Sequence, residues 1–220
     1  MALPTYLEIV NEVLVRLREP TVQTVTQNTF SALIGKWVNE VKRQVNDAYD
    51  WDALNTSVSF NTVADQYSDY PLTGAGLRFR INDVINTTRY YPLTPIAKPD
   101  LDRYIYMIKE PVKNPPTFFN LGGVDSNGDT NVSLWPIPDG VYNIRFSLVV
   151  PENDFASDND TTKMPKEPII LGAYARAIVE RGEDAGLNSS EAQFIFKQSL
   201  ADHIAIEVGR SPESDAWGLV

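Results

Sequence analysis

Few side chains in this 220-residue sequence could do chemistry. The chain has no cysteine, which excludes a disulfide, a thiolate metal site and a cysteine nucleophile. Its one histidine, His203, falls on the apolar side of a predicted helix, where packing or a subunit contact is the commoner role. The sequence contains no Gly-x-Ser-x-Gly elbow, no glycine-rich phosphate loop and no His-Glu-x-x-His pair. We therefore predict no catalytic residue and no cofactor.

Two acidic loops offer oxygen atoms that a cation could use. The loop at residues 125–131 has oxygen-bearing side chains at alternate positions, but Thr130 stands where a calcium loop needs glycine. No glutamate follows at the twelfth position either. Asp154, Asp158 and Asp160 form a second cluster, again without ligand spacing. We interpret the first loop as a plain turn and expect no metal site in either.

The charge of the chain limits its partners. The formal net charge is -10, which opposes duplex DNA or an anionic membrane as a docking surface. Residues 1–150 carry 16 acidic and 13 basic side chains, whereas residues 151–220 carry 13 and 6. No stretch approaches the roughly 18 to 20 consecutive apolar residues of a membrane span. We expect a protein that is made and folded in a cytoplasm and has no membrane contact.

Apolar residues recur with the helical period of 3.6 in four segments, two near each end of the chain. We predict helices at residues 5–17, from a cap at Thr26 or Asn28 to about residue 50, at 168–181, and at 188–209. From residue 55 the period changes to two, which is typical of strands. Further strands are predicted at residues 77–85, 104–108, 117–121, 132–135 and 141–150. Residues 136–140, with two prolines and a glycine, predict a hairpin turn between the last two strands.

This order predicts an α+β fold, in which a four-helix unit with two N-terminal and two C-terminal helices contains an inserted antiparallel β module. The helical domain is expected at residues 1–54 and 163–209, the β-rich domain at 55–162, and a C-terminal extended arm at 210–220.

The arm is the best candidate for a binding segment. It is polar at first and then ends in Trp217, Leu219 and Val220, which suits apolar anchors inserted into a groove of another chain. Docking of the arm on its own domain and a disordered arm are the alternatives. We predict partner-binding residues at Arg210, Pro212, Trp217, Leu219 and Val220.

Aromatic residues gather in the middle of the chain, at Tyr90, Tyr91, Tyr104, Tyr106, Phe118 and Phe119. Exposed rings at these positions could form a sugar-binding or partner-binding surface. The alternation of residues 104–108 instead favours a strand with both faces covered.

Several segments together resemble a known family. Residues 11–22 read NEVLVRLREPTV and precede a long helix that ends near Trp51. Residues 134–142 read LWPIPDGVY and are followed by VVP at 149–151, while AYAR at 173–176 leads to RGED at 181–184. These segments resemble the head-to-tail adaptor proteins of short-tailed bacteriophages, also called tail tubular protein A or gatekeeper-like connectors. Arg18 stands where such proteins more often carry a glycine.

The resemblance implies a structural virion protein of the neck and no enzyme. Such a subunit joins the portal protein after DNA packaging, forms a dodecameric ring with neighbouring copies, and offers a platform to the tail nozzle protein. The helical part would face the portal, the β module would project toward the tail, and DNA would pass through the channel without specific binding. Assembly in the host cytoplasm is also implied.

Two other functions remain as alternatives. A peptidoglycan-degrading tail protein would need a pair of carboxylates in a cleft, which the sequence neither suggests nor excludes. A glycan-binding tail protein would need exposed aromatic rows within residues 77–121.

Overall fold

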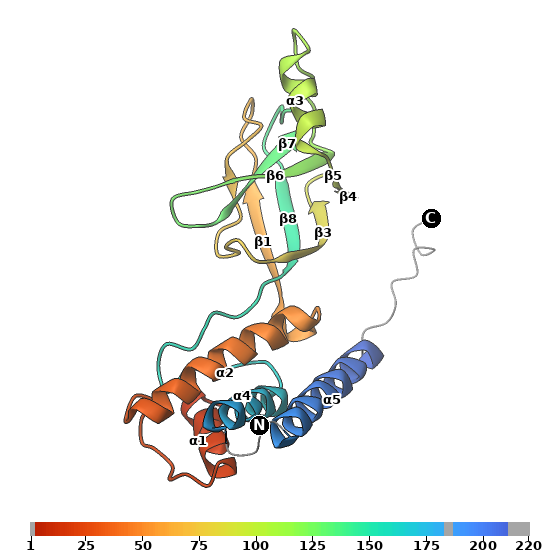
Figure 1. Cartoon of the computed structure of the whole chain (residues 1–220). Helices are drawn as coiled ribbons and strands as arrows, with labels where there is room; N and C mark the ends of the chain where they lie inside the picture. Colours follow the sequence, from red (N-terminus) through yellow and green to blue (C-terminus); the bar gives the residue numbers. More distant parts are fainter. Residues whose placement is uncertain (1–2, 183–186, 211–220) are drawn as a thin grey trace. The chain divides into compact units, whose positions relative to one another are not determined.

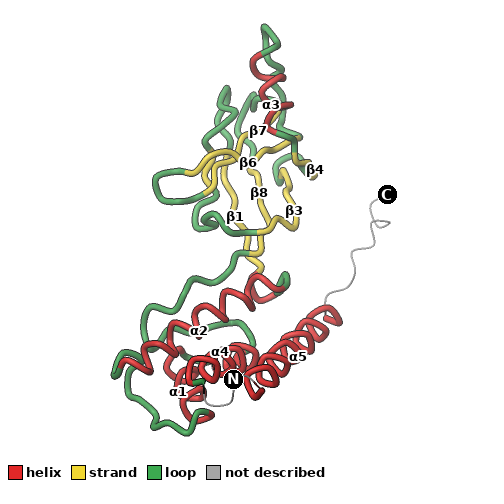
Figure 2. Tube along the Cα trace, in the orientation of Figure 1, coloured by secondary structure: helices red, strands yellow, loops and turns green. Residues whose placement is uncertain are grey.

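The computed structural model describes residues 3–182 and 187–210 (Figure 1). Helices and two β-sheets make up the chain, which confirms the predicted α+β class (Figure 2). The chain separates into two compact units. The helical unit comprises Met1–Leu54 and Pro151–Val220, and the β unit comprises Asn55–Val150.

The described residues of the helical unit contain the four helices that the apolar period predicts. They are α1 (Tyr6–Arg16), α2 (Thr29–Ala48), α4 (Lys166–Arg181) and α5 (Leu187–Arg210), with a short 3₁₀ turn η1 (Asp52–Leu54) after α2. Thr5 caps α1 in a reciprocal arrangement with Glu8. Asn28, one of the two predicted caps, accepts a hydrogen bond from the backbone N–H of Ser31 at the start of α2.

Two helix ends use a left-handed backbone. Gly182 ends α4 with φ +62°, as its position in the sequence predicts. Arg18 follows α1 with φ +60°, the conformation that glycine adopts at least cost. This geometry explains why a glycine would suit position 18. At the other end of the unit, α5 runs through Asn188 and Gly209 to Arg210, so neither residue marks a helix end.

Helix α4 lies at the centre of the helical unit and packs against α1, α2 and α5. Its buried residues include Ile169, Ile170 and several small side chains. Gly172 is the point of closest approach, because a Cβ atom there would lie 2.6 Å from Val41 Cγ1 of α2 and 3.1 Å from the Phe196 ring of α5. Small residues on α4 therefore allow three helices to share one core.

The β unit contains two four-stranded sheets. The first has the order β1 (Asn55–Asn61), β8 (Asn143–Val149), β3 (Arg80–Asn86) and β4 (Tyr91–Pro92). The second has the order β2 (Tyr70–Pro71), β7 (Thr130–Trp135), β6 (Phe118–Val124) and β5 (Thr94–Pro95). The sheets share one core, in which Phe119 of β6 meets Phe146 of β8 edge to face with centroids 5.3 Å apart.

The pairing of β1 with β8 explains how this unit fits as an insertion. The two strands are antiparallel and Asn55 lies opposite Val149. The first and last residues of the inserted segment are therefore neighbours in the sheet, so the segment begins and ends at the same place.

The predicted hairpin between the last two strands is wrong. β7 and β8 belong to different sheets, and residues 136–142 connect them. Pro136 and Pro138 have no N–H group to donate to a hairpin ladder, whereas Ile137 between them forms a parallel bridge with Lys113. The proline-rich segment thus ends one sheet and leads the chain to the other.

The predicted strand at residues 104–108 is also wrong, because residues 104–106 end the helix α3 (Lys98–Tyr106). Pro99 suits the first turn of a helix, and Leu101 and Ile105, four residues apart, are its buried positions. Tyr104 and Tyr106 are exposed on this helix, not covered on both faces. The alternation of residues 104–108 favoured a strand, but it combines the last residues of α3, 104–106, with the first residues after the helix, 107–108.

We predict that Gly172→Ala destabilises the protein by about 1–3 kcal/mol, because the added methyl group has no room between Val41 and Phe196. Gly209→Ala is the matched control, since that helical glycine has no atom within 4 Å of the added group. It should be neutral or stabilising by up to about 1 kcal/mol. Urea unfolding of both variants checks this, and equal stabilities would contradict the packing argument.

Candidate functional site

Of the five predicted partner-binding residues, the structure describes Arg210 alone. Arg210 is the last residue of α5, and its guanidinium pairs with Glu207 at 3.1 Å. Pro212, Trp217, Leu219 and Val220 lie outside the described residues. The role of the arm therefore stays a prediction, and the structure describes only the point at which the arm begins.

That point is anchored inside the helical unit. Glu207 is only 6% exposed, and its Oε1 accepts a hydrogen bond from the backbone N–H of Asp52 at 2.9 Å. The other carboxylate oxygen pairs with Arg210. A buried carboxylate with a backbone donor and a guanidinium fixes the end of α5 against η1. The described chain thus ends at a defined position on the helical unit.

Helix α5 also carries exposed apolar side chains. Phe194, Ala201 and Val208 are seven residues apart, so they lie along one line of the helix, and all three are exposed. Phe194 has 65% of its surface accessible, and Ile195 and Ile206 are exposed beside this line. Phe196 lies on the opposite side, against Gly172 of α4. This α5 stripe, defined by residues 194, 201 and 208, is a surface that another protein chain could cover.

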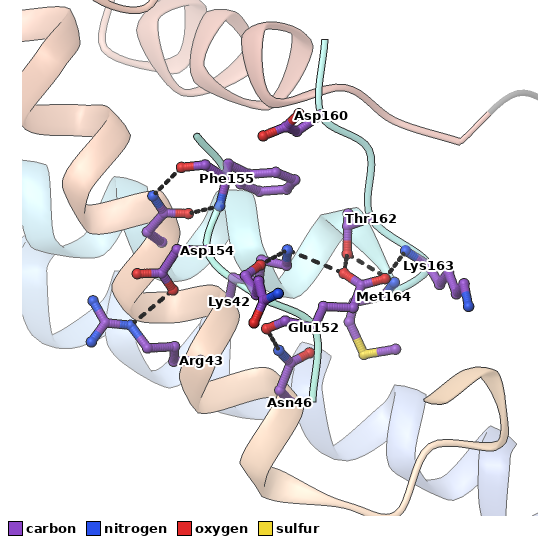
Figure 3. A network of polar contacts seen from close by, with 12 residues as sticks. Lys42, Arg43, Asn46, Glu152, Asp154, Phe155, Asp160, Thr162, Lys163 and Met164 are labelled. Atoms are coloured by element: carbon purple, nitrogen blue, oxygen red, sulfur yellow. Dashed lines mark hydrogen bonds and ion pairs between the residues drawn. The ribbon is translucent and has the colours of Figure 1, made fainter. Parts of the chain in front are cut away.

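A buried lysine holds the segment by which the chain returns from the β unit (Figure 3). The side chain of Lys42 in α2 is 3% exposed, and its Nζ donates to the backbone carbonyl of Asn153 at 2.7 Å. The same ammonium lies 3.2 Å from Glu152 Oε2 and 3.9 Å from the centroid of the Phe155 ring. Lys42 thus satisfies its charge with a carbonyl, a carboxylate and an aromatic face.

Further contacts fasten this return segment, residues 151–162, along its length. Asn39 of α2 exchanges two hydrogen bonds with the backbone of Phe155, and Asn46 donates to the carbonyl of Glu152. The carboxylate of Glu152 also accepts from Thr162 Oγ1 at 2.6 Å and from the Lys163 N–H at 2.8 Å.

These contacts correct one predicted boundary. The sequence pattern predicts a β-rich domain at residues 55–162, whereas the return segment belongs to the helical unit. Its polar side chains and backbone groups find their partners on α2, not on a strand. The sequence analysis did not identify this network. The signal was Lys42 itself, a charged residue on the apolar face of α2 beside Val38, Val41 and Val45.

The acidic cluster of the return segment has structural partners. Asp154 pairs with Arg43 at 3.2 Å, and Asp158 Oδ1 accepts from the Val25 N–H at 3.0 Å. Asp160 accepts hydrogen bonds from the Ser157 hydroxyl and from the N–H groups of Ser157 and Ala156. These donors lower the pKa of Asp160 to about 2, and the Ser157 hydroxyl makes the largest contribution.

The remaining chemical candidates are also engaged locally. Asp125 Oδ1 accepts from the N–H groups of Asn127 and Asp129, and the hydrogen bond from Asp129 is the main cause that lowers the pKa of Asp125. His203 Nδ1 lies 2.7 Å from the carbonyl oxygen of Ser199 within α5. Within residues 3–182 and 187–210, no three histidine or carboxylate side chains come together as a metal site requires.

The central aromatic residues do not form one surface. Phe119 is buried in the β core, and the Tyr91 hydroxyl donates to the Pro116 carbonyl at 2.8 Å. Tyr104 stacks on Trp135 with centroids 5.2 Å apart, and Tyr106 meets the Tyr67 hydroxyl at 2.8 Å. Tyr90 is exposed on a different loop.

The described part of the chain thus contains a helical unit in which the end of α5 is fixed at Glu207 and Arg210, an exposed apolar stripe on α5 and an inserted β unit. Residues 4–217 match the family described as SU10 adaptor protein. The chain therefore belongs to this adaptor family, which confirms the predicted membership among phage head-to-tail adaptors. Comparison with curated proteins finds none that matches the chain. Among the helices that the structure describes, none has the length and hydropathy to cross a membrane.

We predict that Lys42→Met destabilises the protein by about 3–5 kcal/mol, because it leaves the Glu152 carboxylate without its buried ammonium partner. Arg16→Met is the control. This substitution breaks the ion pair between Arg16 and Glu167, which has a similar length of 2.9 Å. Because both side chains of that pair are well exposed, the expected loss of stability is about 0–1 kcal/mol. Denaturant unfolding measures both, and a small effect at Lys42 would contradict the role of the network.

The lowered pKa of Asp160 predicts an acid dependence. Because the folded-state pKa of about 2 lies below the ordinary aspartate pKa of 3.8, this carboxylate stabilises the fold above about pH 4. That contribution is lost as the pH falls toward 2. Asp160→Asn should therefore flatten the acid limb of the stability curve, and Ser157→Ala should raise the pKa of Asp160. An NMR titration that places the Asp160 carboxyl near its ordinary value would refute the assignment.

Proposed function

We propose that this chain is the head-to-tail adaptor subunit of a bacteriophage, which forms a ring between the portal and the tail nozzle and lines the DNA channel. The observation that carries the proposal is the family match over residues 4–217. The ring contains twelve copies, it lies in the neck of the virion, and it assembles in the host cytoplasm. Its partners are the portal protein, the nozzle protein and neighbouring copies.

Two different parts of the helical unit are candidates for contacts with other chains, and they support this proposal. A ring of identical subunits needs two different surfaces that meet at every interface. The α5 stripe supplies an apolar surface, and the arm that starts at Arg210 supplies a segment able to reach another chain. Arg210, Pro212, Trp217, Leu219 and Val220 are the residues that we assign to this second contact.

The distribution of charge supports a role beside DNA. The helical unit carries 20 acidic and 11 basic side chains, a formal net of -9, whereas the β unit carries 9 and 8, a net of -1. Duplex DNA is held non-specifically by cations that neutralise its phosphates. An acidic helical unit at the channel wall would let DNA pass without adhesion, and the function requires neither a catalytic step nor a membrane.

The two alternative functions receive less support from the described residues. A glycan-binding protein needs a row of exposed rings, but Phe119 and Tyr91 face inward and Tyr90 is separate from the α3 tyrosines. A peptidoglycan-degrading protein needs a general acid, which is a carboxyl group with a raised pKa. Hydrogen bonds within turns instead lower the pKa values of Asp125 and Asp160.

We predict that the full chain adds about a dozen copies to the portal ring encoded with it, and that a variant lacking residues 210–220 stays folded but does not join. Light scattering of the mixed proteins measures the added mass, and circular dichroism checks the fold of the truncated variant. A control variant with Ser211→Ala and Ser214→Ala keeps the apolar end of the arm and should join normally. Normal joining by the truncated chain would refute the role of the arm, and no added mass with the full chain would refute the adaptor function.

A further inference from the structure

The β unit has a groove of about 480 Å³ that neither sheet closes. Residues 81–84 of β3 and residues 119–121 of β6 line it. Leu93, Pro95 and Ile96 also belong to its lining. Most of these side chains are apolar, so the groove offers an extended hydrophobic surface bounded by two strands.

Both strands have an open edge beside the groove. On the side away from β8, the described partner of β3 is β4, which pairs only with Ile85 and Asn86. On the side away from β7, the described partner of β6 is β5, which pairs only with Phe118 and Phe119. The neighbouring stretches, residues 81–83 and 120–124, have no strand paired to them on these sides among the described residues. Open edges of this kind accept an added strand.

A polar atom in the groove lining also lacks a partner. Asn120 Nδ2 donates to the carbonyl of Ile96 at 2.8 Å, which fixes the orientation of the amide. Its Oδ1 is buried and has no hydrogen-bond donor among the described residues. A buried acceptor without a donor is costly, so a backbone N–H from an added segment would stabilise this site.

We propose that this groove binds the C-terminal segment of another copy, residues 215–220, as an added strand. This inference rests on the proposed ring, because it assigns the arm of one subunit to the β unit of a neighbour. In an extended segment, Trp217 and Leu219 point to the same side. They supply apolar side chains for the groove, while the backbone of the segment supplies hydrogen-bond donors for the open edges.

Charge favours the β unit over the helical unit as the acceptor of this arm. The arm after Arg210 carries Glu213 and Asp215 and no basic residue, so it is acidic. Without the two acidic residues of the arm itself, the helical unit has a formal net charge of -7 and repels the arm, whereas the β unit is close to neutral at -1.

The length of the arm permits a contact with a neighbour. Ten residues follow Arg210, and a fully extended chain of that length spans roughly 33–36 Å. In a ring, the same contact repeats at every interface, with the arm of each subunit in the groove of the next.

Disulfide trapping tests the proposal, because the natural chain has no cysteine. Chains with Leu219→Cys are mixed in equal amounts with chains that carry Leu121→Cys, which lies in the groove and is 40% exposed. The mixture is assembled on the portal ring and oxidised, and mass spectrometry quantifies the linked peptides. About half of the Leu219→Cys arms should be linked to position 121, since half of their neighbours carry that cysteine.

Val141→Cys is the matched control, because Val141 is an apolar residue of the same unit, is 68% exposed and lies outside the groove. Linkage of position 219 to 121 should exceed linkage to 141 at least several-fold. Equal linkage in particles of full mass would overturn the groove assignment and leave the adaptor function standing. Linkage that appears only when one chain carries both cysteines would also overturn it, because the arm would then bind its own chain.

A charge substitution gives a second readout that does not depend on oxidation. Leu121→Lys should reduce the number of copies added to the portal ring several-fold, whereas Val141→Lys should not. Equal incorporation of the two folded variants would contradict the proposal. If the unmodified chain adds no mass to the portal ring, both the proposed function and this inference fail.

Discussion

The helical unit depends on one buried ion pair. Its helices come from two stretches of chain, and α2 ends more than a hundred residues before α4 begins. Lys42 joins the stretches, because its ammonium is satisfied only by the Asn153 carbonyl, Glu152 and the Phe155 ring of the return segment. A lysine buried without these partners would be strongly unfavourable. The position of α4, and with it the core that α4 shares with three helices, therefore follows from this contact.

The fold of the β unit lowers the entropic cost of bringing the two stretches of the helical unit together. Closing a flexible loop of the 96 residues from Asn55 to Val150 would cost roughly 4 kcal/mol in chain entropy. Because β1 and β8 pair with Asn55 opposite Val149, the folded insertion presents its two ends side by side. The insertion can then vary in its loops without disturbing the helices. Its open strand edges become available for contacts with other chains.

Local signals in the sequence predicted the helices. They failed where contacts between distant residues determine the structure. Asn28 was identified as a candidate cap because the start of a helix needs a side chain that accepts a backbone N–H, and the apolar period predicted the end of α4 at residue 181. The proline-rich segment after Trp135 looked like a hairpin turn, since local sequence does not say to which sheet the next strand belongs. Lys42 and the return segment were missed because their partners lie more than a hundred residues away. Of the predicted binding residues, only Arg210 lies in the described chain, so the arm remains a proposal.

The central claim concerns where this chain sits in a virion. A cryo-electron microscopy reconstruction of the neck from the phage that encodes it tests that claim most directly. The account predicts a closed ring of copies between the portal and the nozzle, with the acidic helical unit at the channel and the arm of each copy on another chain. A neck without this chain, or a ring whose channel wall is basic, would contradict the account.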